Sequence, residues 1–282
     1  MTNPEPLAVA LAAAHEAGAI LLEGFGASPP APLLGRRHRA ATKSSDIDLV
    51  TDFDRRSEAL IVARLGAAFP ADLIVAEEAS ADADGAARPA TAAARWLIDP
   101  IDGTTNFAHG LPFFCVSIAR EVHGRVEVGV VYAPALGLCF ACAAGQGATL
   151  NGERITVSDE RDLAGSLLAT GFPYDRHTSP HANFEQFVAL QRRARGVRRF
   201  GSAALDLCLV AAGRFDGYWE MKLKPWDLAA GALMVEEAGG RVTGWRGEPV
   251  ALDRGAAVAS NALIHDSLLA ALATLPIPPP AL

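Results

Sequence analysis

The stretch WLIDPIDGTTNF, residues 96–107, combines an apolar run, two carboxylates and a glycine followed by polar residues. The apolar run predicts a short buried strand, and Asp99 and Asp102 come at its carboxyl end. Gly103 lets the backbone approach a ligand closely, because it has no Cβ. Thr104 and the polar residues after it can begin a helix, whose free N–H groups bind anions. The stretch therefore predicts acids beside an anion-binding turn at the edge of a sheet.

Further acids occupy similar places elsewhere in the chain. Glu77 and Glu78 follow the apolar run Leu73–Ala76, and Asp227 lies between Trp226 and an apolar helix. Carboxylates at the end of a buried sheet are costly unless a cation neutralises them. A bound metal is the physical solution, and all-oxygen ligation selects Mg²⁺, Mn²⁺ or Ca²⁺. Taken singly, these acids also fit a solvated strand end, an ordinary turn or a helix cap; together they favour a metal-bridged phosphate site.

The composition limits the classes of protein to be considered. The chain has 282 residues, 50% of them hydrophobic, and a formal net charge of −7. Such a length can bury a large core, and the negative charge argues against a nucleic-acid partner. We expect neither a signal peptide nor a membrane span near the N-terminus, because charged residues interrupt the Ala-rich stretch there. The location expected from this is cytoplasmic. We expect buried, reduced thiols at Cys115, Cys139, Cys142 and Cys208.

Apolar periodicity predicts helices and strands that alternate in blocks, which is typical of a layered α/β fold. Helices are expected over residues 7–25, from 54 to at least 65, 184–195, 202–212, 228–238 and 264–275. Strands are expected over residues 73–76, 96–98, 115–119, 126–132, 138–143, 167–170, 217–220 and 256–260. No flexible linker divides the chain, so we expect one domain over residues 1–282, built of two closely packed halves at roughly 1–150 and 151–282.

Three segments carry no clear chemistry in this interpretation. The low-complexity run Ala81–Ala94 is expected to be an exposed loop. The basic run Arg36–Arg39 fits a solvated loop better than a phosphate sensor. A second basic cluster, Arg192–Arg199, fits a helix face paired with nearby acids better than a contact for a larger anionic substrate or a partner.

Four motifs, in order along nearly the whole chain, resemble those of the inositol monophosphatase family. They are the stretch at 96–107, the segment WDLAAG at 226–231 continuing through 236–240, the segment from Lys43 to Asp54, and Ala76-Glu77-Glu78. The resemblance implies a five-layer αβαβα sandwich, the fold type shared with fructose-1,6-bisphosphatase. It also implies a homodimer and catalysis that depends on two or three Mg²⁺ ions, with Mn²⁺ as a substitute and lithium as an inhibitor.

The resemblance assigns metal ligands by position. Glu77, Asp99 and the main-chain carbonyl of Ile101 would hold the first ion. Asp99, Asp102 and Asp227 would hold the second, and Glu77 would help to hold a third, weaker ion.

The resemblance also assigns catalytic and phosphate-binding residues. Thr104, oriented by Asp54, would position the attacking water, with Glu78 close by and Glu77 shared with the metal. The backbone N–H groups of Gly103 and Thr104 would hold the phosphate.

The alcohol half of the substrate would meet a third group of residues. Glu220 and Asp102 would contact its hydroxyl groups, and Ala203 would line the pocket through its backbone. Glu220 and the residues after it look most similar to bacterial inositol-1-monophosphatase-type members.

The function expected from all of this is the hydrolysis of a small phosphate monoester by a metal-activated water. The expected reaction converts myo-inositol 1-phosphate to inositol and phosphate. No Cys or Ser nucleophile with a paired base is evident, which fits direct attack by water. Three sister substrates stay open: fructose 1,6-bisphosphate, histidinol phosphate and a 3′-phosphoadenosine nucleotide. A regulatory protein-binding module that keeps the fold also stays open.

Overall fold

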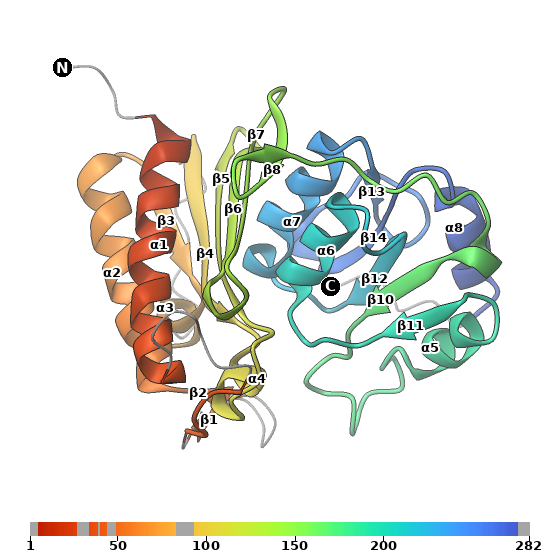
Figure 1. The fold of residues 1–282 in the computed structure, drawn as a ribbon, viewed down its shortest axis with the longest axis horizontal. Coiled ribbons are helices and arrows are strands. Elements are labelled where there is room, and N and C mark those ends of the chain that lie inside the picture. The colour runs from red at the N-terminus through yellow and green to blue at the C-terminus, as the bar shows by residue number, and fades with distance from the viewer. Residues whose placement is uncertain (1–4, 27–33, 39, 44–48, 83–92, 276–282) are drawn as a thin grey trace.

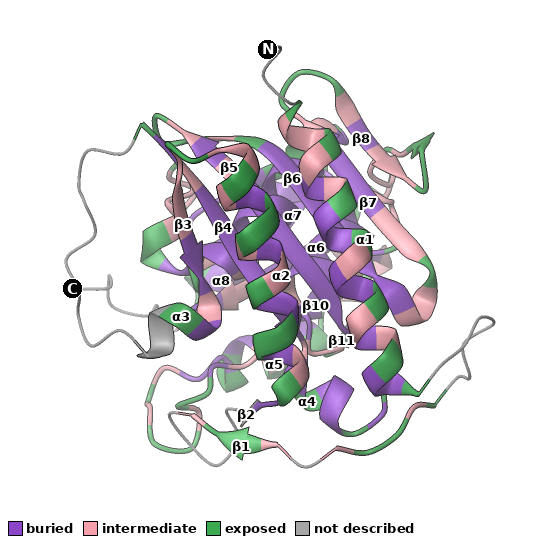
Figure 2. Ribbon diagram, turned by 90° about the vertical axis from the view of Figure 1, so that its left-hand side faces the viewer, coloured by how far each residue is buried: buried purple, intermediate pink, exposed green. Residues whose placement is uncertain are grey.

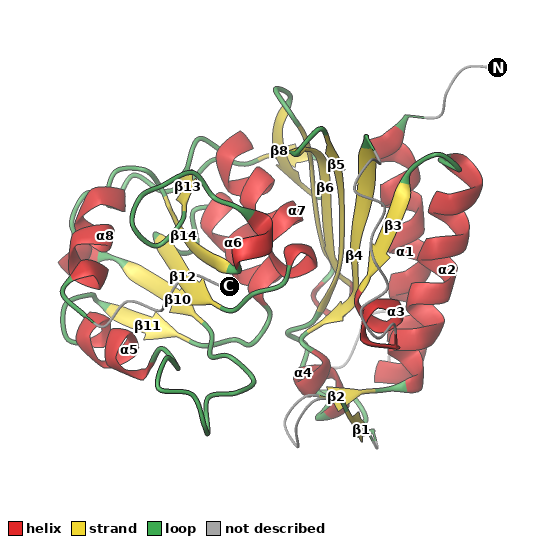
Figure 3. Ribbon diagram, turned by 180° about the vertical axis from the view of Figure 1, so that it is seen from behind, coloured by secondary structure: helices red, strands yellow, loops and turns green. Residues whose placement is uncertain are grey.

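Two β-sheets alternate with three layers of helices (Figure 1). The structure is a computed structural model that describes residues 5–26, 34–38, 40–43, 49–82 and 93–275. In this part of the chain, α1 and α2 cover the outer face of the first sheet, α6 and α7 fill the space between the sheets, and α5 and α8 cover the outer face of the second (Figure 3). The five-layer αβαβα arrangement is thereby confirmed.

The helices share apolar faces that pack on the sheets, apart from two short ones at the edge of the first sheet. Their bounds are α1 (Pro6–Phe25), α2 (Asp52–Ala68), α3 (Glu77–Asp82), α4 (Thr104–Ala108), α5 (Phe184–Gln191), α6 (Ala203–Ala211), α7 (Pro225–Glu237) and α8 (His265–Ala273).

The first sheet has seven strands in the order β3-β4-β5-β6-β7-β8-β9. These are β3 (Leu73–Ala76), β4 (Ala94–Asp102), β5 (Cys115–Val122), β6 (Arg125–Ala133), β7 (Leu138–Ala143), β8 (Gly147–Leu150) and β9 (Glu153–Arg154). Among the strands that the structure describes in this sheet, only β3 and β4 run parallel, with Ala76 opposite Ile98. Because the carboxyl ends of parallel strands meet at one edge of a sheet, Glu77 and Asp99 emerge at the same edge.

The second sheet has five strands in the order β11-β10-β12-β14-β13. These are β10 (Leu167–Thr170), β11 (Gly196–Arg198), β12 (Gly217–Met221), β13 (Arg241–Thr243) and β14 (Ala256–Ser260). A separate two-stranded sheet pairs β1 (Ala41–Thr42) with β2 (Leu49–Val50).

A bulge in β4 decides where its two acids face. Asp99 pairs with Ser117 of β5, but Asp102 pairs with Cys115, so two residues of β4 oppose the single residue Val116. Successive side chains of a regular strand alternate between faces, which would place residues three apart on opposite sides. The extra residue, next to Pro100 that cannot donate a ladder hydrogen bond, removes this alternation. Both carboxylates therefore reach the same cavity.

Helix α1 is, within the described residues, the one helix long and apolar enough by length and composition to cross a membrane. Its inner face is buried against the first sheet together with α2 (Figure 2). The buried side chains are Ala10, Ala13, Ala14, Ala17, Leu21 and Phe25. This burial is what the core helix of a globular domain shows.

The structure corrects several expected boundaries. Strand β4 continues through Asp102, because the bulge lets it stay paired with β5. Helix α7 begins at Pro225, three residues early, since proline suits the first helical position. Helix α5 ends at Gln191, so the cluster Arg192–Arg199 is not a helix face; its last residues form β11 and the turn after it. None of these arginines forms a salt bridge within the described residues.

The remaining segments are partly outside the described residues. Most of the expected loop Ala81–Ala94 and Arg39 of the first basic run lie there. Arg36 and Arg37 are exposed, as the solvated-loop interpretation predicts. His38 differs, because its Nε2 lies 2.7 Å from the Gly24 carbonyl oxygen and its ring stacks on Phe107. His38 is half-buried as a result.

The cysteines are free thiols, as expected. Cys115, Cys142 and Cys208 are buried, whereas Cys139 is partly exposed. Cys139 and Cys142 have C-x-x-C spacing, but both lie on β7, where residues three apart point to opposite faces. The spacing therefore does not bring the two sulfur atoms together.

Candidate active site

A cavity of about 690 Å³ lies at the edge where β3 and β4 end, between the first sheet and the second half of the chain. Its walls carry most of the residues singled out in the sequence: Glu77, Glu78, Asp99, Ile101, Asp102, Gly103, Thr104, Ala203, Glu220 and Asp227. The remaining one, Asp54, lies directly behind Thr104. The structure thus brings all of the predicted site residues to one place, from elements far apart in the sequence.

The β4 bulge presents both a carboxylate and a carbonyl to the cavity. Asp99 is 3% exposed, and its Oδ1 accepts a hydrogen bond of 2.9 Å from the backbone N–H of Ile101. The carbonyl oxygen of Ile101 in turn accepts a bond of 2.9 Å from the Thr104 hydroxyl. The side chains of Asp99 and Thr104 therefore fix the backbone of Ile101 at the bulge. The same two side chains are predicted to bind metal and to position water.

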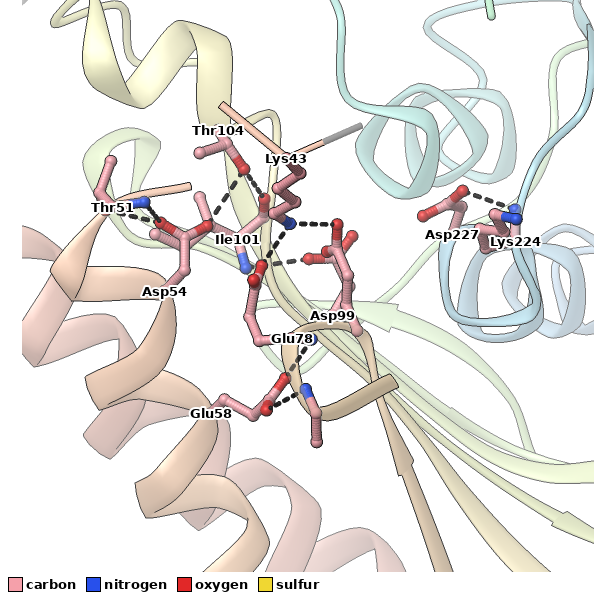
Figure 4. A network of polar contacts seen from close by, with 12 residues as sticks. Lys43, Thr51, Asp54, Glu58, Glu78, Asp99, Ile101, Thr104, Lys224 and Asp227 are labelled. Carbon is pink, nitrogen blue, oxygen red and sulfur yellow. Dashed lines mark hydrogen bonds and ion pairs between the residues drawn. The ribbon is translucent and has the colours of Figure 1, made fainter. Parts of the chain in front are cut away.

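Lys43 ties together the two glutamates that begin α3 (Figure 4). Its Nζ lies 2.8 Å from Glu77 Oε1 and 2.5 Å from Glu78 Oε1. Burial opposes the charge of Lys43, but the two carboxylates outweigh it and raise the pKa of Lys43 above its ordinary value. Burial raises the pKa of Glu78 to about 7, although the ammonium group of Lys43 partly offsets this.

The start of α3 is held from behind by Glu58 of α2. Its Oε2 accepts a bond of 2.8 Å from the backbone N–H of Glu78, and its Oε1 accepts one of 2.9 Å from that of Ala79. Glu58 is only 7% exposed. Because the first N–H groups of a helix have no partner within it, Glu58 acts as a cap supplied by a neighbouring helix.

Asp54 connects the start of α2 to Thr104. Its Oδ2 accepts bonds from the backbone N–H and the hydroxyl of Thr51, at 2.7 and 2.6 Å, and its Oδ1 lies 3.1 Å from Thr104 Oγ1. Asp54 is fully buried, and this burial raises its pKa to about 6 despite the bonds from Thr51. A hydroxyl group between a carboxylate and a carbonyl can orient or pass a proton.

Asp102 bridges the two halves of the chain. Its Oδ2 accepts bonds of 2.8 Å from the Ser202 hydroxyl and 2.7 Å from the backbone N–H of Ala204, at the start of α6. Burial raises the pKa of Asp102 to about 6, although the bonds from Ser202 and α6 lower it.

Gly103, directly after Asp102, has a φ of 96° and begins α4. A Cβ there would lie 2.8 Å from the carbonyl oxygen of Phe113, so no other residue fits. The close approach seen here is to the backbone of the chain itself, and the approach of Gly103 to a ligand stays a prediction.

Asp227 reaches the cavity from α7, apart from the other acids (Figure 4). Its Oδ2 accepts a bond of 2.7 Å from the backbone N–H of Lys224, as in a capping box. Within the described residues, no three acidic, His or Cys side chains converge into a ready-formed metal cage. The acids of the described residues thus share one cavity without forming a ready-made cage of three ligands.

The electrostatics of these acids fit a divalent cation. Burial raises the pKa of Asp99 well above its ordinary value, and the charges of Glu77, Asp102 and Asp227 raise it further. The pKa of Asp227 is raised in the same way by burial and then by Asp102 and Glu77. Carboxylates that repel each other and provide only oxygen ligands suit Mg²⁺ or Mn²⁺. The donor set therefore fits the metal that the sequence predicts.

The other end of the cavity contains Glu220 of β12. The hydroxyl of Tyr218 donates to Glu220 Oε2, and burial raises the pKa of Glu220 to about 7. A Cβ on Gly171 would lie 2.2 Å from either carboxylate oxygen, so the Gly171 backbone makes room for Glu220. The cavity lining also includes Asp206, which the sequence interpretation missed, and Arg199, which it placed on a helix face in preference to a substrate contact. The signal for Asp206 was available, since it is the only acid in the apolar helix Ala203–Ala211.

The chain is a member of the Inositol monophosphatase family, whose sequence model matches residues 3–275. This defines it as a hydrolase of the phosphatase class.

Two of its relatives bear different names. The "Inositol-1-monophosphatase" of Synechocystis sp. is 44% identical over 86% of this chain and 83% of its own length. The "Nus factor SuhB" of Escherichia coli K12 is 41% identical over 94% of each chain.

Solved structures agree with this assignment. The inositol monophosphatase of Anabaena (Nostoc) sp. PCC 7120 is 42% identical, with a TM-score of 0.83 over 96% of each chain. A Thermotoga maritima enzyme of the same kind is 34% identical, with a TM-score of 0.81 over 95% of this chain and 96% of that one.

Proposed function

We propose that this chain is a Mg²⁺-dependent phosphatase that hydrolyses a small phosphate monoester, with myo-inositol 1-phosphate as its preferred substrate. The observation that carries the proposal is the β4 bulge, which aims the carboxylates of Asp99 and Asp102 into one cavity beside the Thr104 hydroxyl. Family membership and the name of the Synechocystis relative support the same reaction.

The cavity residues divide into two candidate metal positions. Glu77, Asp99 and the Ile101 carbonyl would hold one ion, and Asp99, Asp102 and Asp227 the other. Bound there, divalent ions lower the pKa of water and neutralise charge on the attacking and leaving oxygens of an in-line displacement. Lys43 would then exchange part of its contact with Glu77 for the proximity of the substrate phosphate.

The proton and the phosphate would be handled by the chain itself. The Thr104 hydroxyl lies between Asp54 Oδ1 and the Ile101 carbonyl, so it can orient the attacking water and pass its proton toward Asp54. Glu78, held by Lys43, lines the same cavity as Thr104 and would serve the same water. The N–H groups of Gly103 and Thr104 would hold the phosphate, and Ala203 and Glu220 would meet the alcohol half.

Further properties belong to this proposal. They are a homodimeric assembly, a cytoplasmic location, inhibition by lithium, and the use of a third ion held partly by Glu77.

The test is phosphate release from myo-inositol 1-phosphate, fructose 1,6-bisphosphate, histidinol phosphate and 3′-phosphoadenosine 5′-phosphate, each with Mg²⁺ and with EDTA. Mg²⁺-dependent turnover that favours the inositol ester supports the proposal. Preference for another ester keeps the metal chemistry and changes the substrate. Turnover that EDTA does not reduce would refute the metal assignment.

A second candidate function comes from the relatives named "Nus factor SuhB", which are 41% to 45% identical. Such a chain could act through protein contacts, with or without hydrolysis. The absence of turnover on all four esters would favour this candidate, although the full set of acids in the cavity argues for retained catalysis.

A further inference from the structure

We propose that Asp206 selects the substrate by accepting a hydrogen bond from a hydroxyl group of a neutral polyol. This inference rests on the proposed phosphatase function and adds a specificity-determining residue to the wall of the same cavity. The substrate class it defines is a phosphate ester of an alcohol with several neighbouring hydroxyl groups.

Asp206 is a buried carboxylate, one oxygen of which has no hydrogen-bond partner among the described residues. It lies in the first turn of α6, lines the cavity and is only 2% exposed. Its Oδ1 has no hydrogen-bond partner within the described residues. A buried acceptor without a partner costs about 1–3 kcal/mol, so its presence in an apolar helix needs a reason outside the fold.

Helix capping does not supply that reason. Asp102 from the first half of the chain already accepts the hydrogen bond from Ala204 N–H at the start of α6. The side chains on either side of Asp206 are Leu205 and Leu207, and both are fully buried. A leucine at 206 would suit this helix better than a carboxylate. The fold therefore bears a cost that a ligand in the cavity would offset.

The neighbours of Asp206 indicate the chemistry of that ligand. Burial raises the pKa of Asp206 well above its ordinary value, the charges of Glu220 and Asp102 raise it further, and the guanidinium of Arg199 opposes this. Arg199 lines the cavity beside Gly201, where a Cβ would lie 2.7 Å from Arg199 Nη1. This end of the cavity thus offers two carboxylates that accept hydrogen bonds and one guanidinium that donates them.

A neutral hydroxyl group matches this mixture best. It can donate to Asp206 and accept from Arg199, whereas an ammonium group can only donate and would be repelled by Arg199. A second anionic group would be repelled by Asp206 and Glu220. A ring that carries several hydroxyl groups could reach Asp206 and Glu220 together, while its phosphate lies at the acids of the first sheet.

The test compares two esters on three variants in the presence of Mg²⁺. Asp206→Leu removes both acceptors at nearly constant shape, and Asp206→Asn keeps one. Asp216→Asn is the matched control, because Asp216 is held by Ser158 and the backbone of Leu167 but does not line the cavity. The readout is the ratio of kcat/KM for myo-inositol 1-phosphate to kcat/KM for 4-nitrophenyl phosphate, whose alcohol half has no hydroxyl to present.

We expect Asp206→Leu to lower this ratio about tenfold or more, mainly through KM, because a site built to bind a hydroxyl loses its acceptor. Asp206→Asn should lower it less. The melting temperature of Asp206→Leu should not fall, since an unsatisfied buried acceptor is removed. Asp216→Asn should lower the melting temperature and keep the ratio.

An unchanged ratio in Asp206→Leu would overturn the inference, and so would an equal loss on both esters. Wild-type preference for histidinol phosphate would overturn the neutral-polyol assignment. If the wild type hydrolyses neither ester, the proposed function fails, and calorimetric titration with free myo-inositol decides the inference separately. Binding to the wild type that Asp206→Leu abolishes supports it, and no binding to the wild type refutes it.

Discussion

Glu58→Gln should weaken metal binding from a position that touches neither metal nor substrate. Glu58 lies on α2, and its two carboxylate oxygens accept the backbone N–H groups of Glu78 and Ala79 at the start of α3. Helix α3 has six residues, Glu77–Asp82, too few to be stable without such support. Its first residue, Glu77, is one of the proposed metal ligands. Glu58 is therefore a positioning residue for that ligand.

The magnitude follows from the two hydrogen bonds. In Glu58→Gln, one acceptor remains, but the amide –NH₂ replaces the other and faces an N–H group that then has no partner. An unsatisfied buried donor costs about 1–3 kcal/mol, and the remaining bond loses the strength that the carboxylate charge gave it. We expect the free energy of unfolding to fall by about 2–4 kcal/mol. Loss of groups that orient a metal ligand typically weakens metal affinity by about 10–100-fold.

The assay is a Mg²⁺ titration of phosphate release from myo-inositol 1-phosphate, together with urea unfolding of the metal-free protein. The Mg²⁺ concentration at half-maximal rate should rise at least about tenfold, with kcat at saturating Mg²⁺ reduced much less. Glu16→Gln is the matched control, because it makes the same change in an exposed ion pair with Arg64 and should cost under about 0.5 kcal/mol. A destabilised Glu58→Gln protein with unchanged Mg²⁺ dependence would show that Glu58 supports only the fold and would refute the reasoning.

Three further outcomes are expected. Asp99→Asn should reduce turnover by at least about a hundredfold while circular dichroism stays native, because it removes a carboxylate proposed to serve two ions; full activity would contradict the metal assignment. Lys43→Met should destabilise the metal-free protein by about 2 kcal/mol, since Glu77 and Glu78 lose their cation, and Mg²⁺ should raise its melting temperature more than that of the wild type; equal shifts would count against this account. His265 is buried between Thr243 and Ser260, and burial lowers its pKa to about 4. As the pH falls from about 6.5 to 4, the unfolded chain takes up a proton that the native chain does not, so stability should decline by up to about 3 kcal/mol. Urea unfolding across this range should show a shallower decline for His265→Gln, and an identical slope would exclude His265 as its source.

The strands that carry the acids could be predicted because their signals are local. The apolar run Leu73–Ala76 and the run before Asp99 each form a buried strand, and the acids follow where the strand ends. Strand β11 could not be predicted in this way. Residues 196–198 form a strand because they pair in parallel with β10, with Gly196 opposite Leu167. An arginine-rich segment has no local sequence pattern that predicts this pairing.

The roles of several site residues likewise depend on distant partners. From the sequence alone, Glu58 is an ordinary acid on a helix, and its role is visible only from its contact with the start of α3. Arg199 was predicted to lie on a basic helix face, but α5 ends at Gln191, before Arg199. Asp206 could have been noticed as an acid in an apolar helix. Its place in the cavity, and the lack of a partner for its Oδ1 among the described residues, are visible only in three dimensions.

The sequence by itself determined the class of protein, the layered α/β architecture implied by its motifs, and the residues gathered at the site. It could do so because these features can be recognised in short stretches of sequence. They are apolar runs that form strands, a glycine beside the acids, and carboxylates that follow the strands. Only the tertiary structure decided that Asp99 and Asp102 face the same cavity, that Lys43 pairs with both glutamates, and that Asp206 Oδ1 finds no hydrogen-bond partner in the described part of the chain. These features depend on strand register and on contacts between residues far apart in the chain, and such long-range geometry has no local sequence pattern.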